Sequence, residues 1–458
     1  MSCLPDSGST TGRSVSLRHG PGTGVVYLGH EGARVDYFSS ISYLSAAMIR
    51  VAMVVLLTIL AGCPSPTRTV SPPEPSEAVP LVLVSLDGFR WDYIQRPAAS
   101  NLRALASQGV LARRMEPVFP SKTFPNHYTQ VTGLYPDHHG IISNTMEDEV
   151  LGRFTIGDPA AVQNSAWWGG EPIWVTAQRQ GRRSAAYFWP GSEAPIGGML
   201  PTWSTRFDDA VPHATRIQGV LDWLQLPPDS APAFMTLYFS EVDGAGHRSG
   251  PDAIATDSAI ALVDRSVGAL WAGLRRRGLD GRVNLVIVAD HGMSETSPDR
   301  LILLDDYLEA GSYHVVDWSP VAMIRPAAGK TGEVYRRLQA VPHLSVYRKG
   351  EVPARLHFNE HPRIPEIIAI AEPGWSITDK VGRSRYPGPG GAHGYDNQAP
   401  DMGALFLGVG PGFAQGRVVD RVRAVDLYLL MSHLLGLQPA PNDGSLDSIR
   451  TVLRRPPR

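Results

Sequence analysis

One hydroxyl in this sequence is placed where attack on a phosphorus atom is chemically reasonable. Thr123 follows Pro120-Ser-Lys and precedes Phe124-Pro-Asn, and Pro125 suits the first turn of a helix running to Gly133. The start of a helix presents unpaired N–H groups and the positive end of the helix dipole, which favour an anion such as phosphate. A threonine hydroxyl is a poor nucleophile by itself, so this hypothesis requires a base or a metal ion to activate it.

The rest of the chain offers acid and imidazole side chains that suit metal ions. Three apolar runs, at 80–86, 233–239 and 282–289, are typical of parallel strands buried on both faces. Ligands collect at the carboxyl ends of such strands, and each run is followed there by an acid. The residues that we predict to bind metal are Asp87, Asp243, His247, Asp290, His291 and His393.

The strength of this metal prediction differs between the residues. Asp290 and His291 end a buried strand, where both side chains need partners, so packing is a poor explanation for them. Asp87-Gly88 also fits an ordinary turn, and His393 alone would be an ordinary loop residue. The spacing of Asp243 and His247 puts them on one face of a helix, but Gly244 and Gly246 favour a tight loop. Either conformation brings together two ligands that suit zinc.

Other side chains are candidates for contact with a substrate. Asn144 offers a neutral amide donor for a phosphate oxygen, and Trp203 and Phe207 are placed to line a pocket. The side chains of the adjacent His138 and His139 are expected to point in different directions, so we predict loop structure there rather than metal binding.

Composition limits the class of protein. The net charge of −2 over 458 residues gives no electrostatic footprint for nucleic acid. The two cysteines, Cys3 and Cys63, provide neither a disulfide framework nor a cysteine zinc site.

The N-terminal 79 residues read as targeting and spacer segments. Residues 48–63 have a basic start, an apolar run and a small-residue end, the pattern of a secretory signal. Their last residues, Leu60-Ala-Gly-Cys63, resemble the lipobox of bacterial lipoproteins, which predicts a lipid anchor at Cys63 and a bacterial cell-envelope location facing the periplasm or the cell exterior. An ordinary cleaved signal or a buried helix is the alternative. Residues 1–47 are interpreted as a gene-start error or a disordered extension, and 64–79 as a Pro/Ser-rich tether.

Taken together, the motifs resemble those of the nucleotide pyrophosphatase/phosphodiesterase family of the alkaline phosphatase superfamily. The strongest of them are Ser85-Leu-Asp-Gly-Phe-Arg90, Phe119-Pro-Ser-Lys-Thr-Phe-Pro-Asn-His-Tyr128, Thr132-Gly-Leu-Tyr-Pro136, Phe188-Trp-Pro-Gly-Ser192, Asp243 with Gly246-His247, Asp290-His-Gly-Met293 and His393-Gly-Tyr395. The resemblance implies an α/β fold with a mostly parallel central sheet flanked by helices. It also implies a catalytic domain over 80–294 and 390–455, interrupted by a small α+β cap over 295–389.

The resemblance further implies roles for individual residues. Two Zn²⁺ ions per subunit are expected, one held by Asp243, His247 and His393, the other by Asp87, Asp290 and His291, with Thr123 beside the second as nucleophile and metal-associated oxygen. Asn144, with the Phe124 backbone N–H, is expected to hold phosphate oxygens, and Phe124 and Tyr238 to form a slot for a base. The sequence departs from the family pattern at Met146-Glu147-Asp148, where Met-Tyr-Asp is common, and around 203–207.

The activity implied is hydrolysis of a phosphodiester or pyrophosphate bond, such as conversion of a nucleoside triphosphate into a nucleoside monophosphate, through a covalent phosphothreonine. Two alternatives stay open at this point. One is a related two-zinc hydrolase of phosphonates, phosphomonoesters or choline phosphodiesters. The other is a surface lipoprotein that binds nucleotides without turnover.

Overall fold

The computed structural model describes residues 79–454, all of which belong to one unit of the chain, Pro73–Arg458. The predictions for residues 1–47, for the signal 48–63 with Cys63, and for 64–78 of the tether lie outside the described residues. Within residues 79–454, no helix combines the length and the apolar character needed to cross a membrane.

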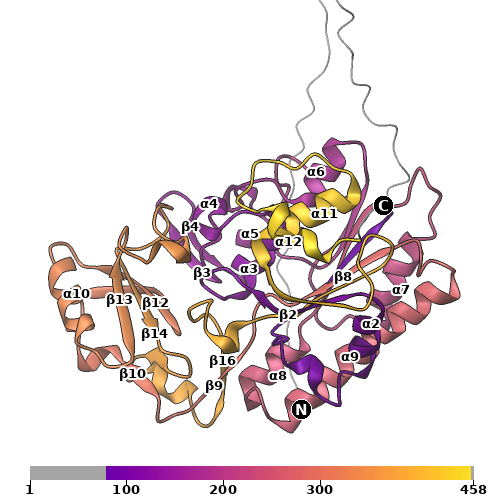
Figure 1. Cartoon of the computed structure of the whole chain (residues 1–458). Helices are drawn as coiled ribbons and strands as arrows, with labels where there is room; N and C mark the ends of the chain where they lie inside the picture. The colour runs from indigo at the N-terminus through magenta and orange to yellow at the C-terminus, as the bar shows by residue number, and fades with distance from the viewer. Residues whose placement is uncertain (1–78, 455–458) are drawn as a thin grey trace, which may run out of the picture. The chain divides into compact units, whose positions relative to one another are not determined.

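An eight-stranded sheet forms the centre of the described unit (Figure 1). Its strand order is β18-β2-β17-β8-β1-β7-β5-β6, and β17 alone runs antiparallel to both of its neighbours. This mostly parallel sheet confirms the predicted fold class. The strands are β1 Leu81–Leu86, β2 Val110–Glu116, β5 Ser184–Tyr187, β6 Trp203–Thr205, β7 Phe234–Phe239, β8 Asn284–Val288, β17 Phe406–Val409 and β18 Arg417–Arg423.

The three central strands are buried because nearly every side chain on them is apolar. β1 pairs in parallel with β7 and β8 in nearly level register, with Leu81 opposite both Phe234 and Asn284. Their carboxyl ends therefore reach the same edge of the sheet. Asn284 is one of the few polar residues on these strands, and its Oδ1 accepts a hydrogen bond from Gly412 N–H.

Helices cover the sheet on both sides (Figure 1). On α9, Val263, Val267, Leu270 and Leu274 recur at helical spacing and are fully buried, which gives the helix one apolar face. Neighbours of α9 include α2, α7 and α8, whereas α3 packs against α11. The helices are α2 Ser100–Gln108, α3 Thr123–Thr132, α4 Pro136–His139, α5 Pro159–Val162, α6 Ile173–Arg179, α7 His213–Trp223, α8 Glu241–Ser249, α9 Ile254–Arg276, α11 Leu427–Leu435 and α12 Leu446–Ile449.

The loop predicted between Asp243 and His247 is wrong, because both residues lie in helix α8. Gly246, one of the two glycines taken as loop signals, serves close packing instead. A Cβ on Gly246 would lie 2.9 Å from Met293 Cε, and one on Gly391 would lie 2.6 Å from Gly246 O. Gly246 thus lets the helix approach the segment that carries His393.

An inserted lobe with its own hydrophobic core leaves the central sheet after β8. Strands β9 (Ser294–Thr296) and β16 (Gly390–Ala392) pair antiparallel where the chain enters and leaves the lobe. An antiparallel sheet of order β11-β12-β14-β13 and helix α10 (Thr331–Gln339) form its body (Figure 1). The strands of the lobe are β10 Leu301–Leu303, β11 Tyr313–Asp317, β12 Val321–Pro326, β13 Leu344–Arg348, β14 Ile367–Ala371 and β15 Ser376–Thr378, and the hairpin β3 Thr145–Asp148 with β4 Gly152–Thr155 faces it.

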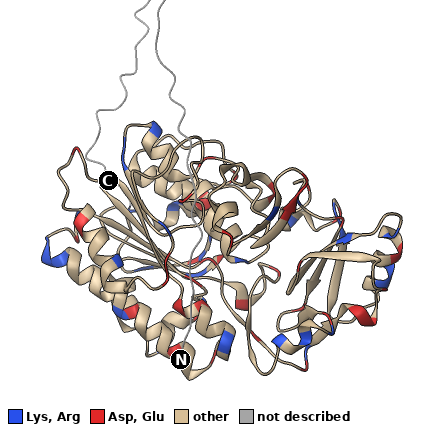
Figure 2. Cartoon of the chain, turned by 180° about the vertical axis from the view of Figure 1, so that it is seen from behind, with Lys and Arg blue, Asp and Glu red and all other residues tan. Residues whose placement is uncertain are grey.

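Charged residues of both signs are interspersed on the helices and on the inserted lobe (Figure 2). Arg363 links the lobe to the body that contains the central sheet, and only 7% of it is exposed. Its guanidinium donates to Asp148 Oδ2 at 2.9 Å, Gly140 O at 2.7 Å and Trp167 O at 2.8 Å. Burial acts to raise the pKa of Asp148, but the bond from Arg363 lowers it to about 2. Arg363 therefore fastens three separate segments.

Replacing Arg363→Met is expected to lower the free energy of unfolding by about 3 kcal/mol, because the buried carbonyls of Gly140 and Trp167 lose their donor. Urea denaturation measures the loss. The matched control is Arg153→Met, whose side chain is 56% exposed and lies 3.7 Å from Glu147, and which is expected to change stability by less than about 1 kcal/mol. Equal effects of the two substitutions would contradict this assignment.

Candidate metal centre and nucleophile

Two groups of acid and imidazole side chains meet at the carboxyl ends of the central strands. One group is Asp87, Asp290 and His291, and the other is Asp243, His247 and His393; within each group the nearest nitrogen and oxygen atoms lie within 4.8 Å of one another. The groups adjoin, because the His291 and His393 rings stack with their centroids 3.4 Å apart. The structure therefore brings together all six residues singled out in the sequence, in the grouping that the resemblance implied.

The three imidazoles of these groups are oriented alike. Nδ1 of His247 lies 2.8 Å from Gly391 O, Nδ1 of His291 lies 2.9 Å from Gly292 O, and Nδ1 of His393 lies 2.9 Å from Ser121 O. A carbonyl oxygen can only accept, so each Nδ1 carries the proton and each Nε2 has a free lone pair. Backbone carbonyls commonly fix metal-binding histidines in this tautomer.

The three carboxylates present unpaired oxygens to the same space. Asp87 Oδ1, Asp243 Oδ1 and Asp290 Oδ2 are buried and accept no hydrogen bond of good geometry from the described residues. Buried carboxylates are normally paired, hydrogen-bonded or bound to a metal ion. Unpaired oxygens beside free Nε2 atoms form a donor set that fits divalent cations, and nitrogen with oxygen donors suits zinc.

The charges of the buried acids also favour the binding of cations. Burial, followed by the negative charges of Asp290 and Asp243, raises the pKa of Asp87 well above its ordinary value. Burial likewise raises the pKa of Asp243. The pKa of His393 lies well below its ordinary value because of burial and the neighbouring His291 and His247. Burial acts to lower the pKa of His291, but the negative charge of Asp290 raises it. Positive charge from bound cations would relieve the repulsion among the acids.

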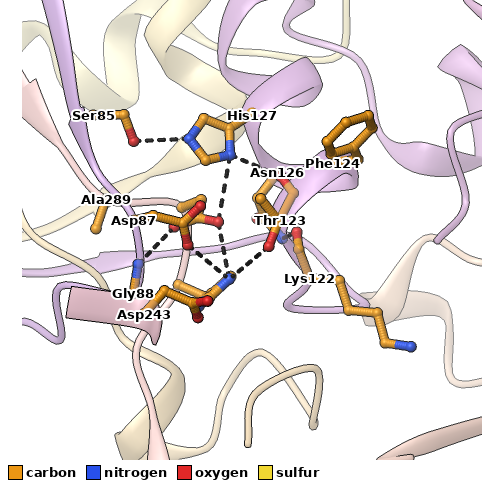
Figure 3. A network of polar contacts seen from close by, with 12 residues as sticks. Ser85, Asp87, Gly88, Lys122, Thr123, Phe124, Asn126, His127, Asp243 and Ala289 are labelled. Carbon is orange, nitrogen blue, oxygen red and sulfur yellow. Dashed lines mark hydrogen bonds and ion pairs between the residues drawn. The ribbon is translucent and has the colours of Figure 1, made fainter. Parts of the chain in front are cut away.

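Thr123 is the first residue of α3, as the position of Pro125 predicted. Its Oγ1 lies 3.4 Å from His291 Nε2, beside the group that contains Asp87 (Figure 3). The Phe124 N–H donates to Asn144 Oδ1 at 2.9 Å, so this N–H orients the amide. We expected the Phe124 N–H to donate directly to a phosphate oxygen, but in this structure it donates to Asn144. The Nδ2 of Asn144 stays available as a donor.

Sequence reasoning missed His127, which is fully buried beneath the site. Its Nδ1 lies 2.9 Å from Thr123 O and 3.4 Å from Asp290 Oδ2, and its Nε2 lies 2.8 Å from Ser85 Oγ (Figure 3). The contact with the carbonyl assigns the proton to Nδ1, so Ser85 donates to Nε2. His127 stands four residues after Thr123, which places both residues on one face of the helix. This spacing is the sequence signal from which the contact between them could have been predicted.

The aromatic residues expected to bind a substrate surround the Asp87 group. The Tyr238 hydroxyl donates to Asp87 Oδ2 at 2.6 Å, so Tyr238 orients a carboxylate of the cluster. The ring of Phe207 packs edge-on against that of Tyr238, with centroids 5.9 Å apart, and Phe207 is 52% exposed. Phe124 lies against Trp168 at 5.9 Å. The exposed face of Phe207 makes it available to a ligand.

His138 and His139 do not join the site. They lie in the short helix α4 rather than in the predicted loop. His139 Nε2 lies 3.0 Å from Thr129 Oγ1, and His138 Nδ1 lies 2.7 Å from Asp443 Oδ2. Both contacts are structural, and neither histidine belongs to the two groups of acid and imidazole side chains.

Asp317, on strand β11 of the inserted lobe, contacts the residue before Thr123 and the residue before Asn144. Its Oδ2 lies 2.5 Å from Lys122 Nζ and also accepts a hydrogen bond from Ser143. In Figure 3 the Lys122 side chain extends away from Asp87 and Asp243. One carboxylate of the lobe therefore fixes the spacing between the Thr123 and Asn144 segments.

Glu147, where the sequence departs from the family pattern, also faces the lobe. It pairs with His314 at 2.9 Å and with Arg325 at 3.6 Å. Unlike Asp317, it contacts neither Lys122 nor Ser143. At the position where the family pattern commonly has a tyrosine, this chain therefore has a glutamate that forms an ionic contact between β3 and the lobe.

We expect Asp317→Asn to lower kcat about 10- to 100-fold with an intact metal content, because Lys122 loses its counterion and the Thr123 and Asn144 segments lose their common anchor. The matched control is Glu147→Gln, which removes another ionic contact of the lobe and is expected to leave kcat within about twofold. Steady-state kinetics and thermal unfolding of both variants make the comparison. Equal losses of kcat would mean that Asp317 serves only to dock the lobe.

Known proteins resemble this chain over most of the described unit. The family model described as "Type I phosphodiesterase / nucleotide pyrophosphatase" matches residues 81–396. Ectonucleotide pyrophosphatase/phosphodiesterase family member 3 of Rattus norvegicus is 37% identical over 396 residues, which cover 84% of this chain and 45% of the relative. A venom phosphodiesterase of Crotalus durissus collilineatus is 38% identical, with 84% and 47% covered. The chain thus spans less than half the length of the curated relatives that it matches.

Solved structures agree with the same assignment. Murine ectonucleotide pyrophosphatase/phosphodiesterase 5, as an inactive variant in complex with AMP, superposes with a TM-score of 0.78 at 36% sequence identity. The human counterpart has the same TM-score at 37% identity. Both comparisons cover 82% of this chain and 100% of the other chain.

Proposed function

This chain belongs to the type I phosphodiesterase/nucleotide pyrophosphatase family, and on that premise we propose that it hydrolyses phosphodiester or pyrophosphate bonds of nucleotides, with two Zn²⁺ ions and Thr123 as nucleophile. The observation that carries the proposal is the pair of adjoining Asp/His groups beside the Thr123 hydroxyl. Bound in those groups, zinc would supply Lewis acidity, lowering the pKa of a bound hydroxyl or water and neutralising charge on phosphate oxygens.

The residues of the chain have distinct parts in the proposed reaction. Thr123 Oγ1 forms a bond to phosphorus and gives up its proton to solvent, while the bond from phosphorus to the leaving oxygen breaks and its electron pair departs with the leaving group. Water then cleaves the phosphothreonine and restores the hydroxyl. Asn144 Nδ2 donates to an equatorial phosphate oxygen, where charge accumulates during transfer.

A nucleotide is the proposed substrate because a neighbouring structure binds AMP and because aromatic rings stand next to the cluster. Phe124 and Phe207 offer ring faces on which a base can stack, and Tyr238 borders the same space while it orients Asp87. Anchoring to a bacterial membrane through a lipid at Cys63 is a further proposal, supported by the sequence pattern alone.

The assay that tests this function uses purified protein with p-nitrophenyl thymidine monophosphate, a diester, and p-nitrophenyl phosphate, a monoester. The diester is expected to react faster, and prolonged chelation followed by desalting is expected to lower its turnover at least about 100-fold, with recovery on adding zinc. Faster monoester hydrolysis would favour the alternative of a two-zinc phosphomonoesterase. Metal-dependent nucleotide binding without product would favour a binding lipoprotein.

Replacing Thr123→Ala is expected to lower turnover at least about 1,000-fold while two zinc ions per chain stay bound, because the hydroxyl supplies the nucleophile and the six other ligands stay in place. Elemental analysis and diester hydrolysis give the two readouts. Thr129→Ala, on the same helix, tests for a general disturbance of α3. Turnover of the Thr123 variant near that of the unaltered protein would exclude Thr123 as nucleophile.

A further inference from the structure

A cavity of about 810 Å³ opens beside the His247 and His393 group, towards the inserted lobe. Asn144 lines it as well, so it is continuous with the proposed phosphate position. Cavities of this size hold ligands as large as a drug molecule. The space therefore exceeds what one phosphoryl group requires.

The walls of this cavity carry several cations. Lys122, Arg248 and Arg385 line it, and Asp317 contributes an acid that pairs with Lys122 at 2.5 Å. Within residues 79–454, Arg248 and Arg385 have no carboxylate within the 4.0 Å that defines an ion pair, and both side chains belong to exposed residues. The cavity thus has two guanidinium groups that are free to bind an anion.

The position of the nucleophile decides which part of a substrate enters this cavity. Thr123 Oγ1 lies beside His291, in the other group of ligands. In-line displacement at phosphorus places the leaving oxygen opposite the attacking one. The leaving group is therefore directed to the side of His247 and His393, which opens into the cavity.

We propose that Arg248 and Arg385 form a subsite for an anionic leaving group, the pyrophosphate of a nucleoside triphosphate. The proposal rests on the function proposed above and names its substrate class. Thr123 Oγ1 bonds to the α-phosphorus and releases its proton to solvent. The bond from that phosphorus to the bridging oxygen breaks, and pyrophosphate leaves with the electron pair. Guanidinium groups match its oxygens because they present paired donors to phosphate.

The subsite also discriminates between substrates. A cationic leaving group meets two arginines and is repelled, and an uncharged one gains nothing from them. The positions of the arginines are set by the chain around the site: Arg248 follows His247 on α8, and Arg385 precedes the glycine segment that leads to His393. The segments that carry His247 and His393 therefore also carry the two arginines that select the substrate.

The test compares kcat/KM for ATP with kcat/KM for p-nitrophenyl thymidine monophosphate in a double variant, Arg248→Gln with Arg385→Gln. The ratio of the two values is expected to fall about 10- to 100-fold, because only ATP places a polyphosphate against the arginines. The matched control is Arg383→Gln, two residues from Arg385, exposed and outside the cavity lining, which is expected to leave the ratio within about twofold. Zinc content and Tm of each variant confirm that it is folded.

A binding measurement separates failure of the subsite from failure of the proposed function. Zinc-loaded Thr123→Ala protein is titrated with inorganic pyrophosphate, with and without the two arginine substitutions, and the arginines are expected to tighten binding at least about 10-fold. An unchanged substrate ratio together with unchanged pyrophosphate affinity overturns the subsite even when wild-type turnover is normal. If wild-type protein hydrolyses neither substrate, the proposed function fails, and the titration still decides whether the cavity binds pyrophosphate.

Discussion

The arrangement of this protein depends on three buried carboxylates that face one another. Burial raises the pKa of Asp87, and the negative charges of Asp290 and Asp243 lie close enough to raise it further. Bringing like charges together in a buried place is unfavourable, so folding of the large apolar sheet must supply the driving force and cations must supply the compensation. The backbone shows how closely the segments approach. Gly88 has a φ of +67°, and a Cβ there would lie 2.9 Å from Asp243 Cα. A side chain at Gly88 would therefore push the segment of Asp87 away from that of Asp243.

A layer of neutral donors keeps these charges oriented. The Tyr238 hydroxyl holds one oxygen of Asp87, and the Gly88 N–H donates to Asp290 Oδ1 at 3.1 Å. His127 connects Asp290 with the Thr123 carbonyl and is itself fixed by Ser85. Asp87 and Asp290 are each held through one oxygen by these donors, and the other oxygen of each accepts no hydrogen bond of good geometry from the described residues. Such supporting contacts set the direction of metal ligands and commonly affect affinity and rate as strongly as the ligands themselves. Thr123, the proposed nucleophile, belongs to the same layer, since it shares its helix with His127.

Much of this site followed from the sequence because strand ends are easy to recognise. Apolar runs predicted β1, β7 and β8, and their level register then brought Asp87 and Asp290 together. The helix at Thr123 followed from Pro125. The conformation between Asp243 and His247 was predicted wrongly, because glycine was interpreted by its freedom in turns, whereas here it serves the close packing of Gly246 against Met293. The role of Asp317 could not be predicted from the sequence, for another reason. It lies 194 positions after Thr123 in the sequence, in the inserted lobe, and no local pattern reports a contact over that distance.

The inserted lobe is therefore part of the site rather than an attachment to it. The chain leaves the first group of ligands at His291, passes through the lobe, and returns along β16 to deliver His393 to the second group. The pairing of β9 with β16 holds the two ends of this excursion together, so the stacking of His291 on His393 depends on the base of the lobe. On its way the lobe also contributes Asp317, which holds the segments before Thr123 and Asn144, and Arg385, which faces the cavity. Because the same insertion positions a proposed metal ligand, the segment before Thr123 and the cavity wall, we expect changes in the lobe to alter substrate choice and catalytic geometry together.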